Sequence, residues 1–399
     1  MAALPLAAQT VTFSGQVRER SEADNRSFAA NPHVDVYHYL RTRLAATATI
    51  NDWLTATVEF QDSRTFGQTK TTLNTGSPDF DLRQGNIEVK DIAGTPVSLK
   101  LGRQVISYAN ERLLGRSDWN NTGQSFDGAM ASVTSGDIRV DAFGAALARY
   151  PNTPDYHRDA IVSGLWGTWK PVKGTTNAQL FYIFDSPGND TTRDNRHTAG
   201  AYVNGSVDDL DFEVDGAYQF GMHIRKGAPD RTIAASLVGL RAGYTLKSAA
   251  NLRIGLGFDM LSGLKANDPN GFGAFNTLYG TNHRFYGHLD LVDNTTQRQD
   301  LGLSDPFVQI SVIPWANTRI GADLHLLSTM SDPKEIFANL PSTTSKAIGK
   351  ELDLTINYTP VKAFNFTCGF AVLDGDPDRY LLPGRKTVTW GFGMMTVSF

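Results

Sequence analysis

The sequence has almost no cysteine, and this limits the kinds of protein that it can encode. Cys368 is the single cysteine among 399 residues, so the chain cannot close an internal disulfide. A small secreted scaffold held together by disulfides is therefore excluded, and so is redox chemistry that needs a pair of thiols in one chain.

Long apolar runs are also absent. No segment approaches the roughly 20 consecutive apolar residues that a membrane-spanning helix requires. A helical membrane protein is therefore excluded. A membrane β-barrel is not excluded, because only every second residue of its strands faces lipid and the averaged hydropathy stays low.

Positive charge is not in excess. The net charge is −4, with 37 Lys and Arg against 41 Asp and Glu, which argues against nucleic acid as a partner. The eight histidines are scattered without the spacing of metal-ligand pairs on a helix, and no Gly-x-Ser-x-Gly motif is present. We therefore expect neither an enzyme nor a cofactor.

The sequence is rich in glycine and aromatic residues, and apolar and polar residues alternate strictly in many of its segments. It contains 37 Gly, 22 Phe and 13 Tyr, which favour turns and strands. In Asp211–Phe220, for example, Val214, Tyr218 and Phe220 alternate with Glu213 and Asp215. Such period-2 patterns recur from residue 12 to the end, and they predict strands with one apolar and one polar face.

The segments between these strands alternate between short and long. Short turns such as Ser135–Asp137 are followed by long polar connections, above all residues 107–123, 262–305 and 328–348. This is the rule of outer-membrane barrels, which have short periplasmic turns and long extracellular loops, and it delimits about 18 strands. The count requires Arg284–Val292, itself strand-like, to lie within a loop.

The expected fold is therefore all-β: one transmembrane antiparallel β-barrel over residues 9–399, in the bacterial outer membrane, with both termini periplasmic. Residues 1–8 resemble the end of a signal peptide, because Ala7 and Ala8 precede Gln9. Trp53, Trp169 and Trp315 fall near short turns, where barrels place an aromatic belt.

The last strand has apolar residues on both faces. Val397 and Phe399 suit an outward face, but Val388, Trp390 and Phe392 have the opposite parity. Keeping both sets outward requires a β-bulge near residues 394–395.

Two regions resemble the alginate-export family of outer-membrane porins. The motifs are Leu101-Gly102-Arg103-Gln104, Glu111-Arg112-Leu113, Ser117-Asp118-Trp119, Asn121-Thr122-Gly123, Ser125-Phe126-Asp127-Gly128, Phe275-Asn276-Thr277-Leu278-Tyr279 and Asn282-His283-Arg284-Phe285-Tyr286-Gly287. The resemblance implies a monomeric barrel of 18 strands that passes an anionic polysaccharide through a constricted, arginine-lined lumen. It also implies that Arg103 turns inward and that Arg112 and Arg116 lie in a loop that constricts the pore.

Alternation predicts a basic wall inside the barrel. The candidate residues on the first two strands are Arg18, Arg20, Arg41, Arg43, Tyr37 and Tyr39. Guanidinium groups can hold a passing carboxylate with two parallel hydrogen bonds, and several weak sites in series permit release. By alternation alone Arg103 faces lipid, so without the inward turn it must lie beyond the hydrocarbon band.

The same alternation in the later strands predicts a more acidic wall of the lumen. Its candidates are Glu213, Asp215, Asp259, Asp323, Glu351 and Asp353, with Arg139, Arg253 and Arg319 among them. These charges either select solutes or pair with one another to stiffen the wall, and the sequence leaves both possibilities open.

Asp374, Asp376 and Asp378 are the one candidate for a cation site, against the simpler interpretation of a polar turn. The expected function is an outer-membrane channel for an anionic polysaccharide or oligosaccharide, with membrane lipid and an export protein in the periplasm as partners. The alternatives are a diffusion porin for sugars or small anions, a sheath for a partner protein, and an outer-membrane enzyme.

Overall fold

Alternating residues form long antiparallel strands in the computed structural model, which describes residues 10–30, 32–68, 80–148, 160–171, 175–188, 192–248, 250–292 and 300–399. The predicted leader, residues 1–8, lies outside these ranges. The strands are β1 (Thr10–Asn25), β2 (Asp35–Asn51), β3 (Leu54–Thr65), β4 (Phe80–Val89), β5 (Val97–Gln104), β6 (Phe126–Ser135), β7 (Ile138–Ala148), β8 (Ala160–Trp169), β9 (Asn177–Asp185), β10 (Thr192–Val207), β11 (Leu210–Arg225), β12 (Arg231–Leu246), β13 (Leu252–Leu261), β14 (Gly271–Phe272), β15 (Leu303–Trp315), β16 (Thr318–Ser328), β17 (Ala347–Val361), β18 (Phe364–Gly375) and β19 (Thr387–Ser398).

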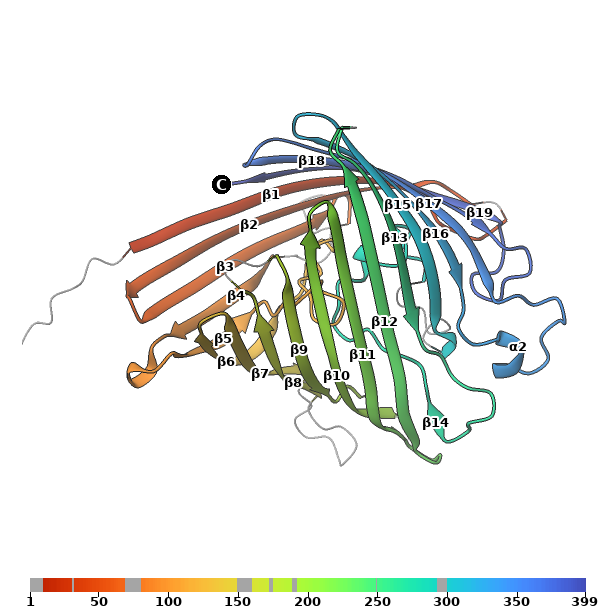
Figure 1. The fold of residues 1–399 in the computed structure, drawn as a ribbon, viewed down its shortest axis with the longest axis horizontal. Coiled ribbons are helices and arrows are strands. Elements are labelled where there is room, and N and C mark those ends of the chain that lie inside the picture. The colour runs from red at the N-terminus through yellow and green to blue at the C-terminus, as the bar shows by residue number, and fades with distance from the viewer. Residues whose placement is uncertain are drawn as a thin grey trace, which may run out of the picture.

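Eighteen of the nineteen strands in the described residues close into a ring (Figure 1). Each pairs antiparallel with its neighbours in chain order, and β1 pairs with β19 from Gln16 opposite Ser398 to Asn25 opposite Thr389. The two-residue β14 is not part of the ring, because β13 pairs directly with β15. The predicted fold class and strand number are confirmed.

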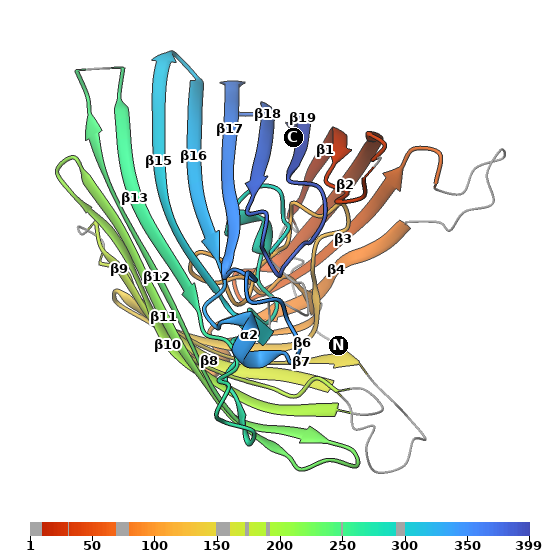
Figure 2. The same ribbon diagram turned by 90° about the vertical axis from the view of Figure 1, so that its right-hand side faces the viewer.

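Helices are few and short in the described residues. Those that lie wholly within the described ranges are α2 (Pro333–Ile336) and the 3-10 turns η1 (Ile92–Gly94) and η2 (Asn282–Arg284). None of the described helices has the length and hydropathy needed to cross a membrane. The segment Arg284–Val292 forms no strand of the ring and lies within the loop before β15, as the strand count required. Figure 2, turned toward the end that carries α2, shows the strands arranged around a central space crossed by loop segments.

The two faces of the barrel differ as the alternation predicted. Large apolar side chains such as Leu180 and Leu256 are exposed on the outer face, whereas inward residues include buried Arg18, Asp141 and Asp259. This inverts the usual distribution of a soluble protein, and it suits a barrel whose outside meets lipid and whose inside is polar.

Aromatic residues mark the end of the barrel with the short turns. Trp169 and Trp315 end β8 and β15, and Trp53 directly precedes β3. All three are exposed, as is Tyr244 near the end of β12. They correspond to one of the two aromatic belts that a membrane barrel is expected to have, the belt at the short-turn end.

The bulge expected in the last strand is not there. β19 pairs with β18 and with β1 without a register shift, so Trp390 and Phe392 face the barrel interior. Trp390 is 1% exposed and its indole N–H donates to Glu22 at 3.0 Å. The prediction was wrong because it assumed a lumen without an apolar core. Residues of the inner loops described below supply one.

Candidate pore site

Two long connections fold into the barrel and pack against each other. Inner loop 1 is residues 105–125, between β5 and β6, and inner loop 2 is residues 262–302, of which 293–299 lie outside the described residues. Leu114 and Tyr279 form an isolated bridge, in which the Gly115 N–H donates to the Tyr279 carbonyl at 3.0 Å. Because backbone bonds join them, the two loops hold each other in place inside the barrel.

Inner loop 1 spans the barrel from wall to wall. Its Asp118 contacts Arg43 on β2, and its Arg112 contacts Asp215 on β11. In the ring of eighteen strands β2 and β11 are nine places apart, so they stand on opposite sides. The sequence resemblance implied a constriction from this loop, and the contacts show that it crosses the lumen.

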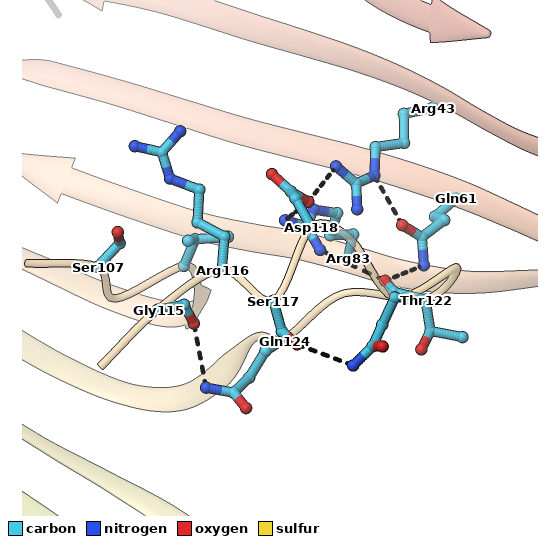
Figure 3. Close-up of polar contacts among 12 residues, drawn as sticks. Arg43, Gln61, Arg83, Ser107, Gly115, Arg116, Ser117, Asp118, Thr122 and Gln124 are labelled. Carbon is cyan, nitrogen blue, oxygen red and sulfur yellow. Dashed lines mark hydrogen bonds and ion pairs between the residues drawn. The ribbon is translucent and has the colours of Figure 1, made fainter. Parts of the chain in front are cut away.

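The basic wall closes around the carboxylate of Asp118 (Figure 3). The Asp118 Oδ1 lies 2.8 Å from Arg43 and 3.1 Å from Arg83. It also lies 3.7 Å from Arg41. All three guanidinium groups are buried, and Arg41 is only 2% exposed. Asp118 thus serves three cations, and Arg83 has a second acid, Glu59, at 3.8 Å, so cations outnumber acids at this wall.

The same wall also holds the backbone of inner loop 1. Arg41 donates to the Asp118 carbonyl at 2.9 Å, and Arg18 donates to the Asn120 carbonyl at 3.3 Å. The Arg20 guanidinium lies 4.0 Å from the centre of the Trp119 ring and 5.0 Å from that of Tyr39. These four predicted arginines and Tyr39 therefore lie together, but in this structure their donors serve the loop.

A glycine permits this close contact. Gly123 has φ +71°, in the left-handed region that other residues adopt only under strain. A Cβ at this position would come within 2.4 Å of a terminal nitrogen of Arg83 and 2.8 Å of one of Arg43. A side chain here would strain the backbone of the loop and displace the guanidinium groups of Arg83 and Arg43.

Arg83 was not among the predicted residues. It is the extra residue of a β-bulge, since Glu59 pairs with Gln84 and Phe60 pairs with Leu82. The bulge turns Arg83 inward after the outward Leu82. Alternation could not find it, because a bulge breaks the period of two on which that reasoning depends.

The ionisation of Asp118 is tied to this cluster. Burial raises the pKa of its carboxyl group, but the guanidinium groups of Arg43 and Arg83 outweigh burial and hold the pKa below its ordinary 3.8. Because the pKa is lowered, the ion pairs stabilise the attachment of the loop fully at pH values above 3.8. This stabilisation is lost as the pH falls through the lowered pKa of Asp118.

We therefore expect the attachment of inner loop 1 to be insensitive to pH between 7 and 4 and to weaken only below 3.8. Single-channel conductance recorded in steps from pH 7 to pH 3 checks this. A step already complete at pH 5 would contradict the assignment of the attachment to Asp118.

On the opposite wall, Arg112 is completely buried among acidic and aromatic groups. It lies 2.5 Å from Asp215 and 2.7 Å from Asp259, and it donates to the Tyr286 hydroxyl at 3.0 Å. Its guanidinium also lies 3.9 Å from the centre of the Phe285 ring. Burial alone lowers the pKa of Arg112, but the charge of Asp259 and its neighbours raises the pKa overall, so this cation stays charged.

Two further residues of the acidic wall hold inner loop 2. Glu351 accepts the Leu289 N–H at 2.8 Å and Asp353 accepts the His288 N–H at 3.0 Å. Burial lowers the pKa of His288 and Asp353 opposes this only in part, so this imidazole favours its neutral form. Of the six predicted acids, Asp215, Asp259, Glu351 and Asp353 thus contact a loop directly.

Glu213 contacts inner loop 1 as well, through the Asn110 amide at 3.0 Å, whereas Asp323 accepts from Gln309 at 3.1 Å on the wall itself. The other predicted cations also pair locally: Arg139 with Asp141 at 2.8 Å, Arg253 with Asp211 at 2.6 Å, and Arg319 with the Ser311 hydroxyl at 2.8 Å. Tyr37 stacks on Tyr39 with ring centres 6.0 Å apart.

Arg103 does not turn inward. It pairs across the sheet with Asp127, next to the buried Phe126, and follows exposed Leu101 on the same face. Its guanidinium lies 2.9 Å from Asp127 and 3.4 Å from Asp81. The inward expectation was wrong, because β5 keeps its register without a bulge at this position.

Arg116 lies in inner loop 1, as expected, but its side chain points away from the arginine cluster in Figure 3. It is 56% exposed and pairs with Glu111 at 3.3 Å. The pore site therefore depends on Arg112 and Asp118 of this loop rather than on Arg116.

The candidate cation site near the C-terminus does not form. Asp374 pairs with Lys386 at 3.0 Å, and Asp376 accepts the backbone N–H of Asp378 at 2.9 Å, as in a polar turn. Within the described ranges, no group of three or more His, Cys, Asp or Glu residues could hold a metal ion.

Asp118 and Trp119 stand in a motif of the family resemblance, but neither was assigned a role from the sequence. Trp119 is an apolar contact between inner loop 1 and the last strand. Its ring stacks on His283 of inner loop 2 with centres 3.8 Å apart, and the edge of Phe392 packs against it at 4.9 Å. The unexplained apolar face of the last strand was the available signal. It predicts an apolar partner inside the barrel.

Comparisons with known proteins agree with this architecture. The model of a family described as alginate export matches residues 9–375. Among curated proteins, none matches the chain significantly.

The solved structures share the fold at low sequence identity. The outer membrane protein opdK from Pseudomonas aeruginosa has a TM-score of 0.58 at 13% identity, over 97% of this chain and 99% of that one. OccK9 (OpdG) from the same organism has a TM-score of 0.61 at 12% identity, over 98% of both chains. OccAB4 from Acinetobacter baumannii has a TM-score of 0.59 at 8% identity, over 99% of both. At this identity the likeness shows the fold alone.

Proposed function

The chain belongs to the alginate-export family and is an outer-membrane β-barrel channel, and on that premise we propose that it passes an anionic oligosaccharide or polysaccharide through its lumen. The proposal includes no catalytic step. The chain's own residues bind, orient and release a solute that carries carboxylate groups.

The observation that carries the proposal is the arrangement of three guanidinium groups around one carboxylate. Arg41, Arg43 and Arg83 all lie within 3.7 Å of the Asp118 Oδ1. A uronate carboxylate has the same charge and the same acceptor atoms as an aspartate side chain. Asp118 therefore occupies the position of a solute carboxylate, and a passing anion would compete with it for the same donors.

This competition supplies a way to open the path. Inner loop 1 is attached to the basic wall by the contacts that an anionic solute would replace. A polymer with many carboxylates offers repeated, individually weak contacts, and these permit movement along the wall as well as capture. The loop and the cargo thus exclude each other at the arginines.

The proposed orientation places the short turns and both termini in the periplasm and the long connections outside the cell. The barrel itself has no energy source, so export requires a periplasmic partner that delivers the polymer to the short-turn end. We propose that the barrel works as a monomer, since its lumen and both inner loops come from one chain.

One observation favours a second candidate, a porin for small sugars or anions. Inner loop 1 crosses from β2 to β11, and two of the cavities beside the loops have volumes of about 450 and 200 Å³. Such spaces suit single sugar units. Block of ion current by uronate oligomers of increasing length separates the candidates, because a polymer channel binds longer oligomers more tightly.

Replacing both Arg41 and Arg43 with alanine is expected to lower the preference for anions. A unit charge acts on an ion 4 Å away by about 1 kcal/mol in water, so the loss of two charges should reduce the anion-to-cation permeability ratio on the order of tenfold. Reversal potentials in a salt gradient across a planar bilayer measure this ratio.

The matched control replaces Arg64 and Arg103, two arginines in ion pairs outside the arginine cluster, with alanine. It removes the same charge from the protein but should leave the permeability ratio unchanged. An equal ratio in the R41A/R43A variant and the wild type would refute an anion-selective wall.

A further inference from the structure

Apart from the arginine cluster, a polar cavity lies inside the barrel at the end with the short turns. Its volume is about 450 Å³, and its walls come from β4 to β8 and from the beginning of inner loop 1. Ser98 lies near the start of β5, Arg139 near the start of β7 and Thr168 near the end of β8, and each of these positions is next to a short turn. We call this cavity the vestibule.

The vestibule contains a lysine and a glutamate that face each other without pairing. Lys100 and Glu88 are directly opposite in the register of β4 and β5, and both line the cavity. The ion pairs within 4.0 Å among the described residues include neither of them. A cation that lines a cavity without a partner is available to a ligand.

A buried amide adds an unused acceptor. Gln104 lines the vestibule, is 1% exposed, and its Oε1 has no hydrogen-bond partner among the described residues. Its amide nitrogen makes only long contacts, at 3.3 Å to the Gly128 carbonyl and 3.5 Å to the Gly102 carbonyl. An unsatisfied buried acceptor is costly, so this oxygen calls for a donor from a molecule in the cavity.

Arg139 keeps part of its guanidinium free. Its Nε donates to Asp141 at 2.8 Å and one terminal nitrogen donates to the Ser132 hydroxyl at 2.9 Å. Asp141 also accepts from the Tyr108 hydroxyl at 3.1 Å, so its charge is satisfied within the protein. Arg139 is 51% exposed, and its other terminal nitrogen can bind an anion.

We propose that the vestibule is a binding site for a sugar acid, with the carboxylate held by Lys100 and Arg139 and a hydroxyl donating to Gln104. The inference rests on the proposed function and assigns the first binding site on the short-turn side. Chloride or sulfate, which carry no hydrogen-bond donor, would leave Gln104 without one. A neutral sugar would offer no carboxylate to Lys100 and Arg139, whereas a polyhydroxylated carboxylate offers both an anion to the cations and a hydroxyl to Gln104.

The test measures binding of glucuronate to the purified protein by titration calorimetry, with glucose as the uncharged comparison. The K100Q variant should bind glucuronate about tenfold more weakly, because it loses one charge-assisted hydrogen bond. The Q104L variant should weaken glucuronate and glucose alike. Heat-resistant mobility in gel electrophoresis verifies that each variant is a folded barrel.

The matched control is K170Q, which removes the same charge from an exposed lysine in the turn after β8, outside the vestibule. It should bind glucuronate as the wild type does. Equal weakening in K100Q and K170Q would overturn the proposed site, and so would equal affinity of the wild type for glucuronate and glucose.

The two proposals fail separately. Unchanged glucuronate binding in K100Q, together with a lowered permeability ratio in the R41A/R43A variant, would remove the vestibule site and leave the anion channel. Vestibule binding that depends on Lys100, together with an unchanged permeability ratio in R41A/R43A, would leave the site and remove the arginine wall as the selective element.

Discussion

The R112M variant is expected to lose about 3–5 kcal/mol of stability, because it removes one partner of a buried ion cluster. Methionine is unbranched and can pack on the Phe285 ring in place of the guanidinium, but it leaves the carboxylates of Asp215 and Asp259 without this cation. Urea unfolding of the barrel in lipid vesicles measures the loss. Single-channel recordings should also show a larger and noisier current, since inner loop 1 loses its attachment to β11 and β13.

The R116M variant is the control for this experiment. Arg116 is in the same loop, but it is 56% exposed and pairs only with Glu111, so its loss should cost less than about 1 kcal/mol. Similar losses in the two variants would contradict the role of Arg112 as the buried anchor of the loop.

The D118N variant is expected to release inner loop 1 from the basic wall without unfolding the barrel. Arg41, Arg43 and Arg83 would lose the carboxylate that they share, and the loss of even one charge-assisted hydrogen bond shifts the equilibrium toward the released loop on the order of tenfold. Conductance and anion preference should both rise, because the path widens and the arginines become accessible. Uronate should also block the current at lower concentration.

The D81N variant is the control, because Asp81 pairs with Arg103 rather than with an arginine of the cluster and is 60% exposed. Its conductance and selectivity should match those of the wild type. Lower anion preference in D118N would contradict the view that Asp118 occupies the position of a solute carboxylate, because the model of competition requires the opposite sign.

The two variants act on the two attachments of one loop. R112M weakens the attachment that consists of a buried cation among acids and aromatic rings, and D118N weakens the attachment that consists of one partly exposed acid among buried arginines. Stability should depend mainly on the first attachment and selectivity on the second. A double variant that loses both should behave as an open barrel.

Local patterns in the sequence predicted the barrel correctly. Alternation determines which face of each strand is apolar, and it placed Arg18, Arg41 and Arg43 inside and Val214 and Tyr218 outside. The reason is physical and local, since successive side chains of a strand point to opposite faces. Connector lengths then delimited the strands, and the number agreed with the ring of eighteen.

Local patterns failed where the backbone or the surroundings depart from the ideal strand. Arg83 lies on a β-bulge, so the alternation of successive residues could not predict that its side chain points inward. Trp390 and Phe392 face inward because apolar residues of the inner loops meet them there, for example Trp119. The expectation of a purely polar lumen therefore led to the prediction of a bulge that β19 does not have.

What the sequence by itself determined is the barrel: its strand number, its two faces, and a first pair of strands with arginines inside. Only the tertiary structure decided what these arginines contact. Arg43 and Asp118 are 75 residues apart in the chain, and Arg112 and Asp259 are 147 apart, so no local period relates them. The path of each loop depends on which wall charges can receive it, and these are brought together only when the sheet closes.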